Sequence, residues 1–283
     1  MNFVTNQALI CPLDAQPLDL VDGCLKCAAN HSFDIASRGY VNLLAAADKR
    51  SRDPGDSKAM IAARRDFLAA GHYAPVAEKL AELVVPLVTS ESFIVDAGCG
   101  EGYYLARLQQ VLARDYQCHP AFLGFDISKW AMQAAAKKFP ATWLVASNRH
   151  IPVADQSVDV LLGVFGFSSY ESFRRILKPS GKLLLVSAGP NHLLELRKVI
   201  YPEVKVSGST ELEQALDAGF TLVNDSTLTF QTEPLSQDKL AMLLGMTPHL
   251  FRASAEGKRR AMLLDQFELT VDISFQLFES TLV

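Results

Sequence analysis

The stretch VDAGCGEGYY, residues 95–104, decides the fold of this chain. The apolar run Phe93–Val95 leading into it predicts a buried strand, and Leu105–Leu108 after it begins a helix. Three glycines between the strand and the helix tolerate positive φ and leave no side chain in the way of a ligand. The helix start adds unpaired N–H groups and the positive end of its dipole. The stretch therefore predicts a turn that brings backbone against a ligand.

The spacing of the glycines and the nearby acids indicate which ligand this turn binds. Dinucleotide-binding turns use G-x-G-x-x-G, whereas residues 98–102 read G-x-G-x-G and Tyr103 occupies the place of the last glycine. Asp96 ends the strand and Glu101 follows the second glycine. Two acids disfavour a pyrophosphate but suit a cofactor with a cationic amino-acid end. The pattern resembles the first motif of class I methyltransferases, which bind S-adenosylmethionine; the alternative is a glycine-rich turn that binds nothing.

From Ser92 onward, predicted strands and helices alternate, as they do in a doubly wound parallel sheet. Polar and apolar residues alternate over 268–278, which suits an antiparallel strand added at the end. We therefore expect a Rossmann-like class I methyltransferase domain with a seven-stranded, mostly parallel sheet. The predicted strands are 93–97, 121–126, 142–146, 158–165, 182–188, 220–223 and 268–278, and the predicted helices after them are 102–113, 128–138, 170–177, 191–200 and 235–246.

In such sheets the ligand lies beyond the carboxyl ends of the strands. Asp126 ends the second strand, where its carboxylate can accept both ribose hydroxyls or cap the helix that starts near Ser128. Asn148 follows the third strand and can contact the adenine. Phe165 and Phe167 end the fourth strand, where they can stack on a target base or belong to the core.

Bulk composition narrows the class of protein. The 283 residues are 49% hydrophobic and 20% charged, as in folded soluble proteins, and suffice for one α/β domain with an appendage. No apolar stretch could span a bilayer and no signal peptide is visible, so we expect a cytoplasmic protein without membrane contact. A net charge of −4 argues against a general nucleic-acid coat but allows a local basic cleft. The candidate RNA contacts are Arg50, Arg52, Arg64 and Arg65.

Residues 1–45 have a different character, with several cysteines and many turn-forming residues. Asp22-Gly23 between two short apolar runs predicts a hairpin turn. So small a β-rich module buries little core, and a bound metal is the usual additional support in the cytoplasm.

The potential metal ligands follow the spacing C-x2-D and then C-x2-C-x3-H. Cys11, Cys24, Cys27 and His31 would make a closed tetrahedral zinc site of the structural kind. Asp14 takes the place of Cys24 in an alternative set, and a module that folds without metal is a third interpretation. A full set of four protein ligands leaves no open position for catalysis.

Over nearly its full length, the chain resembles the large-subunit (23S) ribosomal RNA (guanine-N1)-methyltransferases of Gram-negative bacteria. The zinc module joined to a basic Asp-Pro-Gly-Asp loop is far more specific than the cofactor motif. The resemblance implies methylation of guanine N1 in an RNA hairpin, with S-adenosylmethionine as the methyl donor. The segments that carry it are Cys11–Leu13, His31–Asp34, Gly39–Leu44, Lys49–Ser57, Ala70–Tyr73, Asp96–Tyr104 and Gly189–Leu193.

The resemblance also implies particular ligands. Zinc would be bound by Cys11, Cys27 and His31, with Asp14 in the fourth position, where the chain departs from the family pattern. Tyr73, Gly100, Glu101 and His192 would contact the cofactor, although Tyr73 and His192 could instead serve helix starts. A homodimer is implied as well, in which the zinc modules help build the RNA cleft. The complete cofactor set is Tyr73, Asp96, Gly98, Gly100, Glu101, Gly102, Asp126, Asn148 and His192.

Methylation of a ring nitrogen that carries a proton calls for a base. Asp53 and Asp56 are the candidates, because Arg50 and Arg52 beside them would hold phosphates; a turn followed by a helix cap is the ordinary alternative. Two other functions remain open: a methyltransferase for another RNA or a small molecule, and an inactive zinc-module RNA-binding factor. The predicted divisions are a zinc and RNA-recognition module at 1–45, connecting segments at 46–90 and a methyltransferase domain at 91–283.

Overall fold

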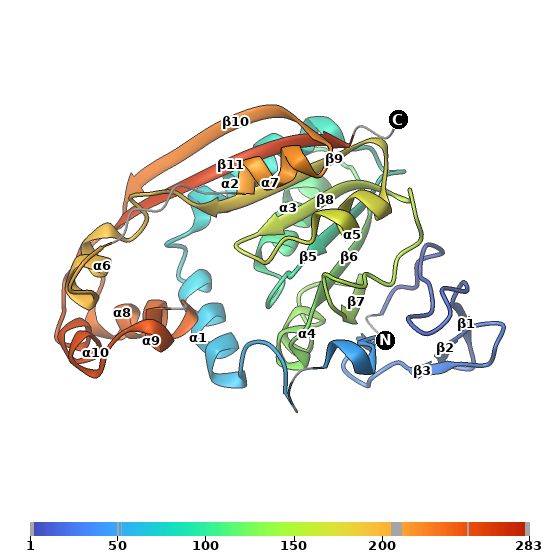
Figure 1. Cartoon of the computed structure of the whole chain (residues 1–283), viewed down its shortest axis with the longest axis horizontal. Coiled ribbons are helices and arrows are strands. Elements are labelled where there is room, and N and C mark those ends of the chain that lie inside the picture. The colour runs from blue at the N-terminus through green and yellow to red at the C-terminus, as the bar shows by residue number, and fades with distance from the viewer. Residues whose placement is uncertain (1–2, 50, 52, 205–210, 248, 281–283) are drawn as a thin grey trace.

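A computed structural model of the chain describes residues 3–49, 51, 53–204, 211–247 and 249–280. One large sheet forms its centre (Figure 1). Its strands are β4 (Val41–Asn42), β5 (Phe93–Ala97), β6 (Ala121–Asp126), β7 (Thr142–Val145), β8 (Val158–Val164), β9 (Leu177–Ala188), β10 (Phe220–Gln231) and β11 (Thr270–Ser280). The order across the sheet is β10-β11-β9-β8-β5-β6-β7-β4.

The seven strands from β5 to β11 confirm the predicted class I methyltransferase sheet. Strands β5 to β9 pair in parallel, and β11 runs antiparallel to both of its neighbours, β9 and β10. Strand β11 is therefore the single reversed strand of the seven. The eighth strand, β4, was not predicted: it comes from the N-terminal module and pairs in parallel with β7, with Val41 opposite Leu144.

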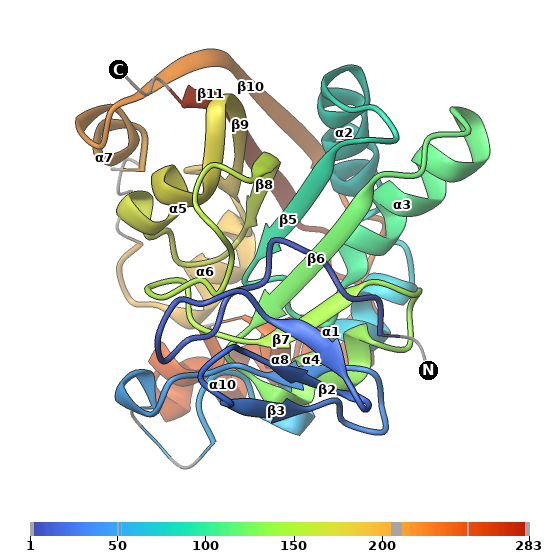
Figure 2. The same cartoon turned by 90° about the vertical axis from the view of Figure 1, so that its right-hand side faces the viewer.

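Helices cover both faces of the sheet (Figure 2). The α-helices are α1 (Lys58–Ala69), α2 (Ala74–Val84), α3 (Tyr103–Asp115), α4 (Lys129–Ala135), α5 (Tyr170–Ile176), α6 (Leu194–Ile200), α7 (Glu211–Asp217), α8 (Gln237–Met246), α9 (His249–Arg252) and α10 (Ala255–Met262), and 3-10 turns lie at Ala46–Asp48 and Val85–Leu87. Successive strand residues face opposite sides, so Ile94 belongs to the core cluster that includes residues of α2 and α3, while Phe93 and Val95 belong to the cluster that includes residues of α5 and α7. The two core clusters thus sandwich the sheet.

Several boundaries differ from the predictions. Strand β10 continues past residue 223 to Gln231, because the polar segment Asn224–Gln231 pairs with β11 as a half-exposed edge strand. The predicted helix at 191–200 begins only at Leu194, since Leu193 has a φ of 52° and ends a turn. Helices α7, α9 and α10 were not predicted; they are 7, 4 and 8 residues long and carry little apolar periodicity.

The N-terminal module contains a small antiparallel sheet of β1 (Asp19–Val21), β2 (Cys24–Lys26) and β3 (Ser32–Asp34). Asp22 and Gly23 both have positive φ, as a two-residue hairpin turn requires, so the hairpin prediction is confirmed. Leu9, Leu25 and Val41 are fully buried in the same core cluster as the central strands. The module therefore shares the core of the larger domain rather than standing apart.

The segment between the module and β5 brings α1 across the carboxyl ends of the strands. Ser57 caps α1, with its hydroxyl accepting the N–H of Met60 at 3.3 Å, and Gly71 ends the helix with a φ of 85°. Helix α1 then lies between α4 and α8 (Figure 1). Among the described residues, no helix is both long enough and apolar enough to cross a membrane.

Candidate cofactor cleft and metal site

The glycine turn joins β5 to α3 with left-handed backbone at each glycine. The value of φ is 73° at Gly98, 55° at Gly100 and 79° at Gly102, a region that strains other residues. The N–H groups of Gly98 and Cys99 both donate to the carbonyl oxygen of Phe125 in β6, at 2.9 Å each. The turn is thus fixed to the neighbouring strand in a conformation that only glycine adopts freely.

A cleft of about 1570 Å3 opens beside this turn, which exceeds the roughly 300–1,000 Å3 of a typical small-molecule pocket. Eight of the nine predicted cofactor residues line it. Gly102 does not line it. A Cβ at Gly102 would stand 3.1 Å from both Ala135 and Trp143, so this glycine allows α3 to pack closely. The eight are Tyr73, Asp96, Gly98, Gly100, Glu101, Asp126, Asn148 and His192.

The cleft contains buried acids whose oxygens are only partly paired. Asp96 and Glu101 are each 1% exposed. Burial, and secondarily the charge of Asp126, raises the pKa of Asp96 to about 8. No described group hydrogen-bonds to Oδ1 of Asp96, whereas Nζ of Lys138 lies 2.8 Å from Oε2 of Glu101. Because a buried polar atom without a partner is costly, Asp96 suits a cationic amino group in the cleft.

Asp126 connects the glycine turn to the start of α4. Its Oδ2 accepts the N–H of Gly100 at 3.1 Å, and its Oδ1 accepts the N–H of Ser128 at 2.8 Å. Burial raises the pKa of Asp126, while these two hydrogen bonds oppose the rise. A carboxylate oxygen can accept more than one hydrogen bond, so this arrangement leaves acceptor capacity for sugar hydroxyls. The side chain of Ser128, rather than Asp126, caps α4 through the N–H of Ala131.

Tyr73 and His192, far apart in sequence, meet at one wall of the cleft. The phenol oxygen lies 3.2 Å from Nε2 of His192, and the N–H of Asp272 donates to Nδ1 at 3.3 Å. Burial lowers the pKa of His192 to about 4, so the ring is neutral near pH 7. With Nδ1 as the acceptor, Nε2 carries the hydrogen and donates to Tyr73. The Tyr73 hydroxyl hydrogen is then available to a ligand.

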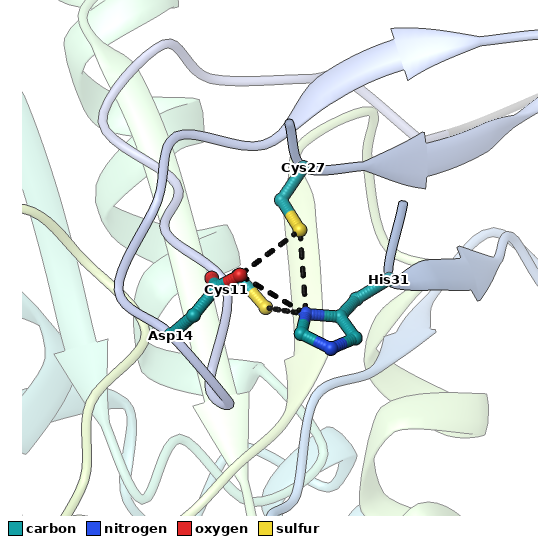
Figure 3. A group of neighbouring side chains, drawn as sticks. All are labelled: Cys11, Asp14, Cys27 and His31. Atoms are coloured by element: carbon teal, nitrogen blue, oxygen red, sulfur yellow. Dashed lines mark hydrogen bonds and ion pairs between the residues drawn. The ribbon is translucent and has the colours of Figure 1, made fainter. Parts of the chain in front are cut away.

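The four predicted metal ligands come together at the N-terminal module (Figure 3). The ligand atoms of Cys11, Asp14, Cys27 and His31 all lie within 4.8 Å of one another. Nδ1 of His31 is 3.5 Å from Sγ of Cys11, 3.4 Å from Sγ of Cys27 and 3.1 Å from Oδ2 of Asp14. Tetrahedral zinc, with bonds of about 2.0–2.3 Å, separates its ligands by roughly 3.3–3.8 Å. The cluster therefore fits zinc.

Cys24, the alternative ligand, lies outside this cluster. Its thiol donates to the carbonyl oxygen of Val21 at 3.2 Å, on the hairpin. Sγ of Cys27 is instead 3.4 Å from Oδ2 of Asp14. The geometry thus favours the set with Asp14.

The two base candidates are placed differently. Asp56 lines the cleft, and its Oδ2 lies 2.6 Å from Nη1 of Arg64. Asp53 does not line the cleft, and its carboxylate pairs with Lys129 at 2.5 Å. A Cβ on Gly55 would lie 2.8 Å from Ile127, so the loop between the two acids packs directly on the residues that precede α4.

The predicted RNA contacts are also divided. Arg50 and Arg52 lie outside the described residues. The side chain of Arg65 is 53% exposed and pairs with Asp66, whereas Arg64 lies inside the cleft. These neighbours on α1 therefore face different surroundings.

Sequence reasoning missed Asp272, a buried acid between apolar residues of β11. A charge at that position of an apolar strand was the available signal. The two aromatic candidates, Phe165 and Phe167, line the cleft and are 42% and 67% exposed, so they lie outside the core.

Comparison with known proteins shows which family the chain belongs to. The family model described as "RlmA, N-terminal", a zinc ribbon, matches residues 9–52, and one described as "Methyltransferase domain" matches residues 94–181. The 23S rRNA (guanine(748)-N(1))-methyltransferase of Streptomyces fradiae is 32% identical over 274 residues, which cover 94% of this chain and 95% of the relative. The chain belongs to the 23S rRNA (guanine-N1)-methyltransferase family. A Micromonospora griseorubida protein assigned provisionally to this activity is 34% identical over 261 residues, 85% of each chain.

Solved structures support the fold of this family member. A Haloferax volcanii protein assigned provisionally as a methyltransferase, solved in complex with the Trm112 methyltransferase activator, has a TM-score of 0.51 and 19% identity over 82% of this chain and all of that chain. The methyltransferase domain implies S-adenosylmethionine as cofactor, and the zinc ribbon with its Cys/His/Asp cluster indicates structural zinc. The relatives named above come from Gram-positive bacteria, so they support the family and not its Gram-negative branch.

Proposed function

We propose that this protein methylates N1 of a guanine in a hairpin of 23S ribosomal RNA. The observation that carries the proposal is the cofactor cleft joined, in one chain, to a zinc-ribbon module whose four ligand atoms lie within 4.8 Å. A relative that matches 94% of the chain bears this activity in its name. A small-molecule methyltransferase would leave the zinc-ribbon module without a use. An inactive RNA-binding factor would leave the intact cofactor cleft without one.

Bound S-adenosylmethionine would supply an electrophilic methyl group on its sulfonium. The residues of the chain then have to hold the cofactor, exclude water and present the guanine in line. Asp96 offers its unpartnered oxygen to the amino group, Asp126 offers acceptors to the ribose, and Tyr73 donates its hydroxyl hydrogen from the far wall.

Guanine N1 carries a proton that must leave during methyl transfer, so a base near the nucleophile is required. Asp56 is our first candidate, because it lines the cleft; Asp53 stays second, because it faces Lys129 instead. A base within a hairpin must also be extruded before its Watson–Crick edge is accessible. Phe165 and Phe167, exposed in the cleft, are suited to stack on the extruded guanine.

The volume of the cleft leaves room for a nucleotide beside the cofactor. Arg149 and Arg252, both exposed residues of the lining, would hold its phosphates. Arg65 on the outer side of α1 is a further candidate.

We also propose that the protein is cytoplasmic and belongs to the Gram-negative branch of the family. We propose further that it forms a homodimer in which the zinc ribbons help to build the RNA cleft. The exposed apolar side chains of Leu13, Leu20 and Val21 on the module support a contact there. Light scattering of the purified protein measures the oligomeric state directly.

Mass mapping of 23S ribosomal RNA tests the substrate. Cells that lack this protein should lack one N1-methylguanine, and the wild-type gene should restore it. An unchanged methylguanosine pattern would refute the proposed substrate. Calorimetry separates the alternatives: an inactive RNA-binding factor would not bind S-adenosylmethionine, and a small-molecule enzyme would bind it and leave the RNA unmethylated.

A further inference from the structure

Acids outnumber arginines in the lining of the cleft. Asp56, Asp96, Glu101 and Asp126 all line it. These acids suit the amino group and the sulfonium of S-adenosylmethionine, but the same ligand also has an α-carboxylate. A carboxylate that enters an acidic, partly dry site needs a cation beside it. Lys138 balances Glu101 but does not line the cleft.

Arg64 supplies a cation at the glycine turn itself. A Cβ built on Gly100 would find two atoms within 4 Å that are not its chain neighbours, and both belong to Arg64, the nearer being Nη1 at 3.4 Å. Gly100 has a φ of 55°, and its N–H is bound by Asp126. The guanidinium therefore lies where a ligand passes over the glycine turn.

Two contacts fix the guanidinium in this position. Nη1 lies 2.6 Å from Oδ2 of Asp56, and Nη2 donates to the carbonyl oxygen of Met246 at 3.2 Å. Met246 is the last residue of α8, where helical carbonyls lack partners within the helix and favour a cation. A guanidinium has five N–H hydrogens, so these contacts orient it and leave others for a ligand.

We propose that Arg64 binds the α-carboxylate of the cofactor, in place of the RNA contact that its sequence context predicts. The inference rests on the proposed function only in taking S-adenosylmethionine as the cofactor. Arg–carboxylate pairs with two parallel hydrogen bonds are among the stronger polar contacts in proteins. Arg65, next in sequence, shares the local context but pairs with Asp66 on the exposed side of α1, so it provides a matched control.

Calorimetric titration of the full chain tests this assignment. The two ligands are S-adenosylmethionine and its decarboxylated form, which keeps the amino group and the sulfonium. We expect the wild-type protein to prefer the carboxylated ligand. Arg64→Met should bind S-adenosylmethionine about 10- to 100-fold more weakly and the decarboxylated ligand within about twofold of wild type. Arg65→Met should bind both ligands as the wild type does.

The outcomes separate the inference from the proposed function. If Arg64→Met weakens both ligands equally, the role of Arg64 is structural and the inference fails. A wild-type protein that binds neither ligand overturns the proposed function and the inference together. If Arg64→Met does not fold, Arg64→Lys provides the measurement, because it keeps the charge without the planar fork. It should lose part of the preference for the carboxylated ligand, and an undiminished preference would overturn the inference.

Discussion

Asp272 in β11 fixes His192, which lies 80 residues earlier in the chain. Its N–H donates to Nδ1 of His192 at 3.3 Å, and its carbonyl oxygen accepts the N–H of Gly189 at 2.7 Å. Its carboxylate accepts the N–H of Asn191 at 2.9 Å and the hydroxyl of Thr229 at 3.1 Å. The reversed strand of the sheet therefore orders the turn that supplies one wall of the cleft.

Replacing the Asp272 carboxylate should weaken cofactor binding through this turn. In Asp272→Ala the N–H of Asn191 loses its acceptor, which costs about 1–3 kcal/mol, and the affinity for S-adenosylmethionine should fall about tenfold. Asp272→Asn keeps an acceptor of the same shape, so it should restore most of the affinity. Calorimetry measures both effects. Glu279→Ala on the same strand, where Glu279 pairs with Lys182, is the control; wild-type affinity in Asp272→Ala would contradict the role.

A methyl group at Gly102 should destabilise the fold more than the same change at Gly23. Both glycines have a φ of 79°, so alanine is strained at either position. At Gly102 the new Cβ would also stand 3.1 Å from Ala135 and Trp143, whereas at Gly23 nothing lies within 4 Å. We expect Gly102→Ala to lose about 1–3 kcal/mol more of unfolding free energy than Gly23→Ala. Denaturant titration measures the difference, and equal losses would show that the packing at α3 is loose.

Zinc content should depend on Cys27 and not on Cys24. Cys27 lies in the four-residue cluster, while Cys24 bonds to the hairpin backbone. Elemental analysis should find one zinc per chain in the wild type and in Cys24→Ser, and a large loss in Cys27→Ser. Asp14→Cys, which supplies a third thiolate, should resist chelators better than the wild type. Zinc lost in Cys24→Ser would mean that the ligand set differs from the cluster.

Cofactor binding should strengthen as the pH rises toward 8. Burial raises the pKa of Asp96 to about 8, so the free protein carries a proton there at neutral pH. A cationic amino group favours the charged carboxylate, so binding below pH 8 releases that proton and the affinity increases with pH over this range. Calorimetry in buffers of different ionisation enthalpy counts the protons released. Cofactor binding to Asp96→Asn should release fewer protons. A release equal to that of the wild type would mean that another group supplies the proton.

Local patterns predicted the centre of this fold well. The strand–turn–helix at residues 93–108 and the alternation after it follow from short apolar runs and glycines, which depend on few distant contacts. Edge strand β10 was predicted too short because its polar half is held by pairing with β11. Strand β4 was missed because a two-residue strand exists only through its partner β7. The domain divisions near residues 45 and 90 stay predictions.

The site residues divide in the same way. The glycines and acids of the turn are adjacent in sequence, so their pattern predicted a cofactor site. The position of Arg64 depends on the packing of α1 against α8, more than 170 residues later, and no local pattern distinguishes it from Arg65. Asp53 and Asp56 likewise differ only in the folded loop, where Asp53 pairs with Lys129 of α4 and Asp56 pairs with Arg64 of α1.

The pairing of β4 with β7 bears on how such enzymes could exchange their recognition modules. Strand β4 of the N-terminal module pairs with β7 of the central sheet. The structural boundary between the two parts therefore does not coincide with the end of the ribbon. A chimera in which a foreign ribbon without a matching strand replaces residues 1–42 would leave β7 as an open edge, a known route to aggregation. A foreign ribbon that brings its own strand would have to place an apolar residue opposite Leu144, where Val41 packs in this chain. Grafting a new RNA specificity onto this scaffold therefore means transplanting an edge strand along with the metal site.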